Sequence, residues 1–249
     1  MTFVLLFFAA FVGGALNAVA GGGSFIAFPA LLFSGVPAVT ANATNSVALW
    51  PAGVASAIAY RKEVREVPRQ VLVVLTIASL AGGLAGALWL LKTPDATFLR
   101  QVPWLLFAAT ILFTFGPAVS KRFRARSGLA LTAAAQVLIS IYGGYFGGGM
   151  GILMLAAMSL MGMEKIHTMN GLKSILGVAI NGIAVAAFIV GGAVAWRPGA
   201  LMIVGGMAGG YAGAALARKV PPVWMRRFVM LVAWGLTAYF FAKAYGLKP

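Results

Sequence analysis

Two short stretches of the sequence carry polar side chains that could bind a solute within an otherwise apolar chain. Asn42, Thr44 and Asn45 stand at the expected start of one long helix, and Asn170 and Lys173 at the start of another. The two amides of the first group, like the amide and ammonium of the second, are three residues apart, so each pair shares a helix face. Lys173 has no carboxylate three or four residues away, and an ionisable residue within a span is a functional candidate. Amide donors, an ammonium group and the positive end of a helix dipole suit an oxygen-rich anion.

A purely structural interpretation is open for both groups. Asn, Ser and Thr at the start of a helix commonly act as caps by accepting hydrogen bonds from the first backbone N–H groups. Lys173 lies near a helix end, so its long side chain could instead extend to the membrane surface. A solute site and a structural role therefore both remain open for these residues.

Two triple glycines form a second candidate feature, since each stands between an apolar helix and a short apolar segment. Glycine permits backbone turns that other residues cannot make, and non-helical backbone inside a bilayer must be buried in protein or line a polar cavity. The pattern predicts broken helices whose exposed N–H groups bind an anion, with tight helix packing through small residues as the alternative. Asn17 directly precedes the first triple and could line the same path. The residues of this prediction are Asn17, Gly21, Gly22, Gly23, Ser24, Gly147, Gly148 and Gly149.

The remaining ionisable residues argue against catalysis. His167 is the one histidine, and it is either an interfacial polar residue or a proton-responsive group at the mouth of the site. The chain has no Cys and four carboxylates, none of them inside an expected span. We therefore expect no catalytic residues, no metal site and no cofactor. The scarcity of buried acids argues against a cation pump and agrees with an anionic substrate.

The composition places the chain in a membrane. Of its 249 residues, 61% are hydrophobic and 9% are charged, whereas a soluble domain carries about 25% charged residues because its surface must be hydrated. The net charge of +15 would suggest nucleic-acid binding in a soluble protein. Here the basic residues form short clusters between long uncharged runs, which is typical of a polytopic membrane protein and predicts no nucleic-acid partner.

The uncharged runs predict an all-α fold with about eight transmembrane helices, since a span needs roughly 20 apolar residues. Two shorter apolar segments, Ser24–Gly35 and Met150–Gly162, are too short for ordinary spans and are expected to be broken or re-entrant. The long helices are expected at about residues 3–20, 44–60, 69–91, 103–120, 128–146, 170–195, 198–217 and 225–245.

Three clusters of Lys and Arg predict the cytoplasmic side by the positive-inside rule. If each short segment returns the chain to the side it came from, both termini lie in the periplasm. The clusters are Arg61/Lys62/Arg65/Arg69, Lys121/Arg122/Arg124/Arg126 and Arg218/Lys219/Arg226/Arg227.

The two halves of the chain resemble each other at an offset near 127 residues. Both triple glycines, both Asn motifs and two Ala-Gly-Gly-x-Ala-Gly-Ala segments match in the same order, which predicts a duplication. The repeats are residues 1–120 and 121–249, which together form one membrane domain. The segments at 81–87 and 208–214 are expected to make close helix contacts. The basic clusters orient the repeats in opposite directions, which is typical of secondary transporters with a substrate site between the repeats.

The long motifs support a family resemblance. The stretches GGGSFIAFPALLFSGVPAVTANATNSVALWPAGVASAIAYRKEV and GGYFGGGMGILMLAAMSLMGMEKIHTMNGLKSILGVAINGIAV resemble the TauE/SafE sulfite-exporter family, also called the 4-toluenesulfonate uptake permease family. The resemblance covers nearly the whole chain. It implies a bacterial inner-membrane transporter of about eight helices that moves sulfite, organosulfonates or related sulfur-containing anions.

The resulting hypothesis is a secondary transporter, and more specifically an exporter, that moves such an anion by alternating access between two inverted repeats. An anion channel or a facilitator without ion coupling is the alternative. A membrane-embedded enzyme would need a catalytic cluster that the His, Cys and carboxylate content does not supply. The expected partners are the small anion and the lipid bilayer, and a homo-oligomer is a further option.

Overall fold

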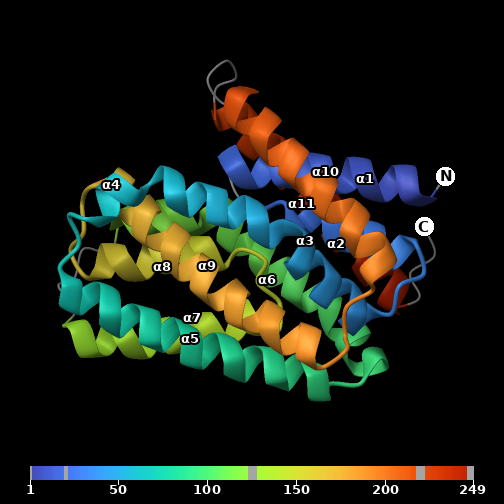
Figure 1. The fold of residues 1–249 in the computed structure, drawn as a ribbon, viewed down its shortest axis with the longest axis horizontal. Helices are drawn as coiled ribbons and strands as arrows, with labels where there is room; N and C mark the ends of the chain where they lie inside the picture. The colour runs from blue at the N-terminus through green and yellow to red at the C-terminus, as the bar shows by residue number, and fades with distance from the viewer. Residues whose placement is uncertain (1, 20–21, 123–127, 217–221, 246–249) are drawn as a thin grey trace.

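The computed structural model describes residues 2–19, 22–122, 128–216 and 222–245, and these residues contain helices and no strand. Helices α5 and α7 lie along one edge of the molecule and α1 and α10 along the opposite edge, with α3, α8 and α9 between them (Figure 1). The helices are α1 (Thr2–Val19), α2 (Ser24–Phe33), α3 (Ala38–Ala59), α4 (Arg61–Val64), α5 (Arg69–Lys92), α6 (Asp95–Arg122), α7 (Leu129–Tyr145), α8 (Met150–Leu160), α9 (Ile166–Val190), α10 (Trp196–Leu216) and α11 (Pro222–Tyr245).

This arrangement confirms the all-α fold. Each expected long helix is present, and both short segments are helical. Three helices begin earlier than expected, namely α3 at Ala38, α6 at Asp95 and α9 at Ile166. The polar residues 42–46 had suggested a helix start because such residues often cap helices. Instead α3 begins directly after Pro37, whose φ of −53° suits a first turn.

The outer surface is that of a multi-pass membrane protein. Large apolar side chains face outward, including Val190 at 89% exposure and Leu231 at 75%, and an apolar surface of this kind is stable when lipid covers it. Four helical stretches among the described residues are long and apolar enough to cross a bilayer, at Arg69–Lys92, Asp95–Phe115, His167–Val190 and Arg227–Tyr245. The expected total of about eight spans stays a prediction. Much of the second and third basic clusters lies outside the described residues.

Glycines join the two halves of the chain at two similar interfaces. Helix α10 packs on α1, and α5 packs on α7. A Cβ at Gly14 would overlap the carbonyl of Gly206, just as a Cβ at Gly144 would overlap the carbonyl of Gly83. These backbones therefore approach as closely as small residues allow. The contacts confirm the close packing predicted for the two Ala-Gly-Gly segments, in which Gly82 and Gly86 meet α7 and Gly209 and Gly213 meet α1.

Helices α3 and α9 cross at the centre of the molecule and run antiparallel. The Trp50 Nε1–H donates to the carbonyl of Val178 at 3.1 Å. Further along α3, the Ser56 hydroxyl lies 3.3 Å from the hydroxyl of Ser174, which precedes Val178 on α9. Apart from the four-residue α4, the same order of long and short helices occurs in residues 2–122 and 128–245, whereas the division into two inverted repeats stays a prediction.

Candidate functional site

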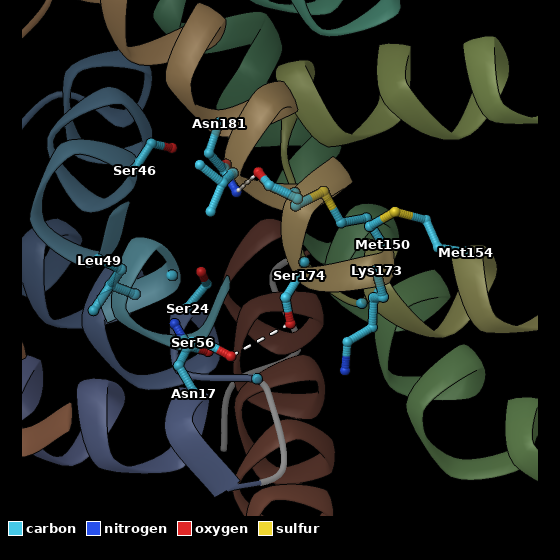
Figure 2. Close-up of a pocket in the computed structure, with 18 of the residues that line it drawn as sticks. Asn17, Ser24, Ser46, Leu49, Ser56, Met150, Met154, Lys173, Ser174 and Asn181 are labelled. Carbon is cyan, nitrogen blue, oxygen red and sulfur yellow. Dashed lines mark hydrogen bonds between the residues drawn. The ribbon is translucent and has the colours of Figure 1, made fainter. Parts of the chain in front are cut away.

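A cavity of about 250 Å³ lies between α3, α9, α8 and the first glycine turn (Figure 2). Its wall combines polar side chains with apolar ones, a combination that suits a small solute with a charged or polar part. Met150, Met154 and Lys173 lie on the right of the view, Asn17 and Ser24 lie on the left, and Asn181 lies above them. The polar lining residues are Asn17, Ser24, Asn45, Ser46, Ser56, Lys173, Ser174 and Asn181.

Matching faces of α3 and α9 supply most of this wall. Five lining positions on each helix follow the spacing of one helical face, with steps of one, three, one and three residues. The five on α3 and the five on α9 match at an offset of 128 residues, whereas Ala52 and Ser56 line the cavity without a counterpart on α9. The matched pairs are Asn45/Lys173, Ser46/Ser174, Leu49/Gly177, Trp50/Val178 and Gly53/Asn181.

Lys173 brings a positive charge into the cavity. Its stem passes over α8, where a Cβ placed on Gly151 would lie 3.2 Å from the lysine Cδ. Its Nζ donates a hydrogen bond to Oδ1 of Asn170 at 3.0 Å. Among the described residues that line the cavity, Lys173 is the one ionisable side chain. It lies on the cavity wall and is half-buried.

Asn45 takes the position that matches Lys173 in the first half. Its side chain is buried, with 2% exposure, and its Nδ2 donates to the Ser24 hydroxyl at 3.2 Å. Its Oδ1 is buried and accepts no hydrogen bond within the described part of the chain. The first half therefore lines the cavity with neutral groups.

The first glycine turn is held by an amide. Oδ1 of Asn17 accepts a hydrogen bond from the N–H of Gly23 at 2.8 Å. Gly22 has a φ of +88°, a backbone conformation that glycine adopts without strain. Asn17, Gly22 and Ser24 line the cavity, whereas Gly23 is buried behind it. Gly21 lies outside the described residues.

The second glycine turn opens directly onto the cavity. Gly147, Gly148 and Gly149 all line it, and α8 begins immediately afterwards. The carbonyl of Gly148 accepts a hydrogen bond from the Tyr142 hydroxyl. The N–H groups of Gly148 and Gly149 make no hydrogen bond to another described residue. These donors, at the start of a helix, are available to an anion.

Besides Gly23, four of the predicted residues do not line the cavity. Asn42 is buried and its Nδ2 donates to the carbonyl of Tyr145 at 3.0 Å. Thr44 accepts a hydrogen bond from the N–H of Ala195 at 3.0 Å. Asn170 accepts a hydrogen bond from the Nζ of Lys173, and His167 is exposed near the start of α9.

The sequence predicted that the polar residues of α3 and α9 lie beside the free backbone N–H groups of a helix start. The early starts of both helices show that they do not. Asn42, Asn45 and Lys173 lie beyond the first turn of their helices, where the backbone N–H groups are already used within the helix. The start of α8 supplies free N–H groups instead. Sequence reasoning did not assign Trp50 or Ser56 to the site. Asn181 lies eight residues after Lys173 on the same face of α9, so a helical-face projection from Lys173 finds it.

Aromatic rings form the wall behind Phe146, which lines the cavity next to the second glycine turn. The rings of Phe146 and Phe28 pack edge to face with centroids 5.8 Å apart, and Phe98 lies 6.5 Å from Phe146. All three side chains are buried. This side of the cavity is therefore closed by tightly packed apolar groups.

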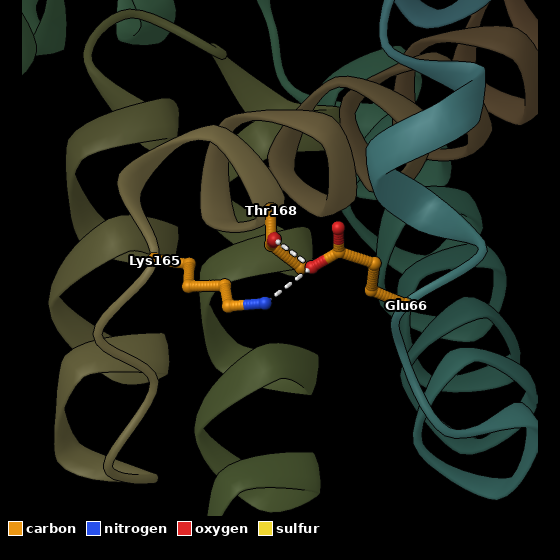
Figure 3. A network of polar contacts seen from close by, with 3 residues as sticks. All are labelled: Glu66, Lys165 and Thr168. Atoms are coloured by element: carbon orange, nitrogen blue, oxygen red, sulfur yellow. Dashed lines mark hydrogen bonds and ion pairs between the residues drawn. The ribbon is translucent and has the colours of Figure 1, made fainter.

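A polar network links the two halves near the start of α9 (Figure 3). Oε2 of Glu66 accepts hydrogen bonds from the Lys165 ammonium at 3.0 Å and from the Thr168 hydroxyl at 3.2 Å. These hydrogen bonds and the charge of Lys165 hold the pKa of Glu66 below its ordinary value. The network ties the loop before α5 to the helix that carries Lys173.

The comparison with known families agrees with this architecture. A family described as "Sulfite exporter TauE/SafE" matches residues 6–240. The chain belongs to the TauE/SafE family. Membership rests on a match over nearly the whole chain, so it covers both glycine turns and both cavity helices. No solved structure matches the chain.

Relatives in other bacteria carry transporter names. The chain is 29% identical to the "Probable membrane transporter protein" of Haemophilus influenzae, over 94% of this chain and 92% of that one. It is 28% identical to "Probable membrane transporter protein YfcA" of Escherichia coli K12, over 97% and 90%. It is 31% identical to "Probable membrane transporter protein ORF9" of a Sinorhizobium species, over 85% and 82%. Family and relatives together indicate a membrane transporter of the TauE/SafE type.

Proposed function

We propose that this chain is a secondary transporter that exports a small sulfur-containing anion, sulfite or an organosulfonate, across the bacterial inner membrane. The proposal depends above all on Lys173, a basic side chain on the wall of a central cavity that contains no acidic residue among its described lining. A positive group within a span is a functional-site candidate because its burial is costly without a partner. A bound anion would supply that partner.

The rest of the cavity suits an anion with oxygen atoms. The N–H groups of Gly148 and Gly149 and the hydroxyls of Ser46 and Ser174 can donate hydrogen bonds to sulfonate or sulfite oxygens. Apolar groups beside them leave room for a short carbon skeleton. The family description supports sulfur oxyanions as the substrate class and export as the direction.

Alternating access is supported by the way the helices pack. Antiparallel crossing of α3 and α9 is what two inverted repeats would produce at their common axis. The site would then stand between the repeats, and rocking of one repeat against the other would open it to each side in turn. In this proposal both termini are periplasmic, and the basic cluster around Arg61–Arg69 is cytoplasmic.

A counter-flow experiment tests the transporter function. The purified protein is reconstituted into vesicles preloaded with unlabelled sulfite or a small sulfonate, and uptake of the labelled anion is measured. A transporter predicts saturable uptake that the preloaded anion accelerates. Large single-channel currents would instead favour the anion channel, and the absence of flux for every sulfur oxyanion would overturn the proposal.

A further inference from the structure

The two halves of the cavity differ in charge, and this difference bears on the charge of the transported molecule. Lys173 carries the one ionisable group among the described lining residues, and its counterpart Asn45 is neutral. The chain's four carboxylates are all described, and none of them lines the cavity. The described cavity therefore has one positive charge and no negative charge.

The positive charge of the cavity and the free backbone N–H groups of the second glycine turn lie on the second half. The Lys173 stem packs over Gly151 in the first turn of α8, so the ammonium group belongs to the same side of the cavity as the free N–H groups of Gly148 and Gly149. An anionic head group would bind on that side, where the ammonium charge and the start of a helix both favour it.

Asn45, on the first half, offers the cavity a hydrogen-bond acceptor where Lys173 offers a charged donor. Its Nδ2 donates a hydrogen bond to the Ser24 hydroxyl, and its Oδ1 accepts none from the described residues. A carbonyl oxygen cannot donate a hydrogen bond to an anionic group. The neighbouring lining residues Leu49 and Trp50 are largely apolar. The hydroxyls of Ser24, Ser46 and Ser56 also line this half, but none of them carries a charge. A second negative charge on a bound molecule would therefore be desolvated without an ionic partner, which is unfavourable in a protein interior.

We propose that the cavity selects anions with one negative charge over anions of the same size with two. This inference rests on the proposed anion transport and adds to it the charge state of the substrate. One ammonium neutralises one anionic group, so the loaded site is electrically neutral. A neutral loaded site can move between the two membrane faces without carrying net buried charge.

Two ligands of nearly equal shape test this selectivity on the purified full-length protein. Sulfoacetamide has one negative charge, and sulfoacetate has two because a carboxylate replaces its amide. Titration calorimetry in detergent gives both dissociation constants. We expect sulfoacetamide to bind about tenfold more tightly or better, since an uncompensated buried charge costs at least that factor.

Asn45→Lys adds the missing second charge at the matched position. It is expected to improve sulfoacetate binding relative to sulfoacetamide by about tenfold, and Ser46→Lys provides a second placement of the charge on the same face if the first variant does not fold. Lys92→Asn is the matched control, because it changes the net charge at an exposed residue outside the cavity and should leave the ratio of dissociation constants unchanged.

The possible outcomes separate the two proposals. Equal affinities of the unmodified protein for both ligands would overturn the charge selectivity while leaving anion transport intact. An unchanged ratio in a folded Asn45→Lys or Ser46→Lys variant would also overturn it, because the discrimination would then arise elsewhere. If neither ligand binds and no sulfur oxyanion is transported, the proposed function itself fails.

Discussion

The two halves of this molecule are alike where helices pack and different where a solute could bind. Gly14 meets Gly206 across one interface in the same way that Gly144 meets Gly83 across the other. In the cavity, by contrast, the matched positions hold a neutral amide and an ammonium group, Asn45 and Lys173. Where two helix backbones touch, no side chain larger than that of glycine fits, whereas residues on a cavity wall can be replaced by others. The two helix interfaces therefore share their glycines, whereas the two sides of the cavity differ in chemistry.

The two glycine turns show the same divergence. Asn17 fixes the first turn by accepting from the N–H of Gly23, whereas Tyr142 fixes the second by donating to the carbonyl of Gly148. The first turn thus has one of its donors occupied. In the second turn the N–H of Gly147 donates to the carbonyl of Tyr142, and the N–H groups of Gly148 and Gly149 stay free beside the cavity. The second turn is therefore the one that we propose to bind the anion.

The largest expected effect concerns the matched interfaces. Gly14→Leu and Gly144→Leu each force a side chain into the backbone of the facing helix, so each should destabilise the protein by about 3 kcal/mol or more. Because the contacts are alike, the two losses should be similar when unfolding is measured in the same detergent. A large loss in one variant and none in the other would show that the interfaces are not equivalent.

The glycine turns should respond unequally. Asn17→Ala leaves the N–H of Gly23 without its acceptor and should cost about 1–2 kcal/mol, because an unsatisfied donor carries its full desolvation cost. Tyr142→Phe removes a donor from a carbonyl and should cost about 1 kcal/mol or less. Chemical unfolding of both variants compares the losses. A larger loss in the free energy of unfolding for Tyr142→Phe than for Asn17→Ala would contradict this prediction.

The smallest expected effect is at the ends of the two cavity helices. Near the start of α9, Glu66 has a lowered pKa, so its contacts with Lys165 and Thr168 stabilise the fold at neutral pH. That contribution is lost as the pH falls through the lowered pKa. Near the start of α3, Thr44 accepts a hydrogen bond that does not titrate.

Melting curves at neutral and acidic pH separate the two contacts. Glu66→Gln should melt slightly earlier than the unmodified protein at pH 7, and the gap should close in acid. Thr44→Val should show a similar gap at both values. A gap for Glu66→Gln that is independent of pH would show that the ionised carboxylate contributes nothing.

Much of the fold could be predicted from the sequence because helices in lipid need long uncharged runs. The eight long helices, the two short ones and the close contacts of Gly82 and Gly209 follow from that rule and from glycine spacing. The starts of α3 and α9 could not, since Asn42 and Asn170 have the side chains of helix caps. Burial within the tertiary structure gave them other partners.

The cavity was only partly predictable for a similar reason. Lys173 and Asn45 were identified because polar groups in apolar helices are conspicuous. Trp50 reaches the same cavity because α3 and α9 cross antiparallel, and that depends on contacts between distant segments. The role of Asn42 likewise depends on Tyr145, which lies 103 residues further along the chain.

The most direct test of the central claim is anion flux through Lys173→Met in reconstituted vesicles, measured beside the exposed-lysine control Lys92→Asn. The substitution keeps an unbranched side chain over Gly151 while removing the charge. If Lys173 binds the anion, Lys173→Met should lose essentially all sulfite or sulfonate flux, with a melting temperature close to that of the unmodified protein, and the control should transport normally. Unchanged flux in a folded Lys173→Met protein would contradict the claim and remove the lysine from the site.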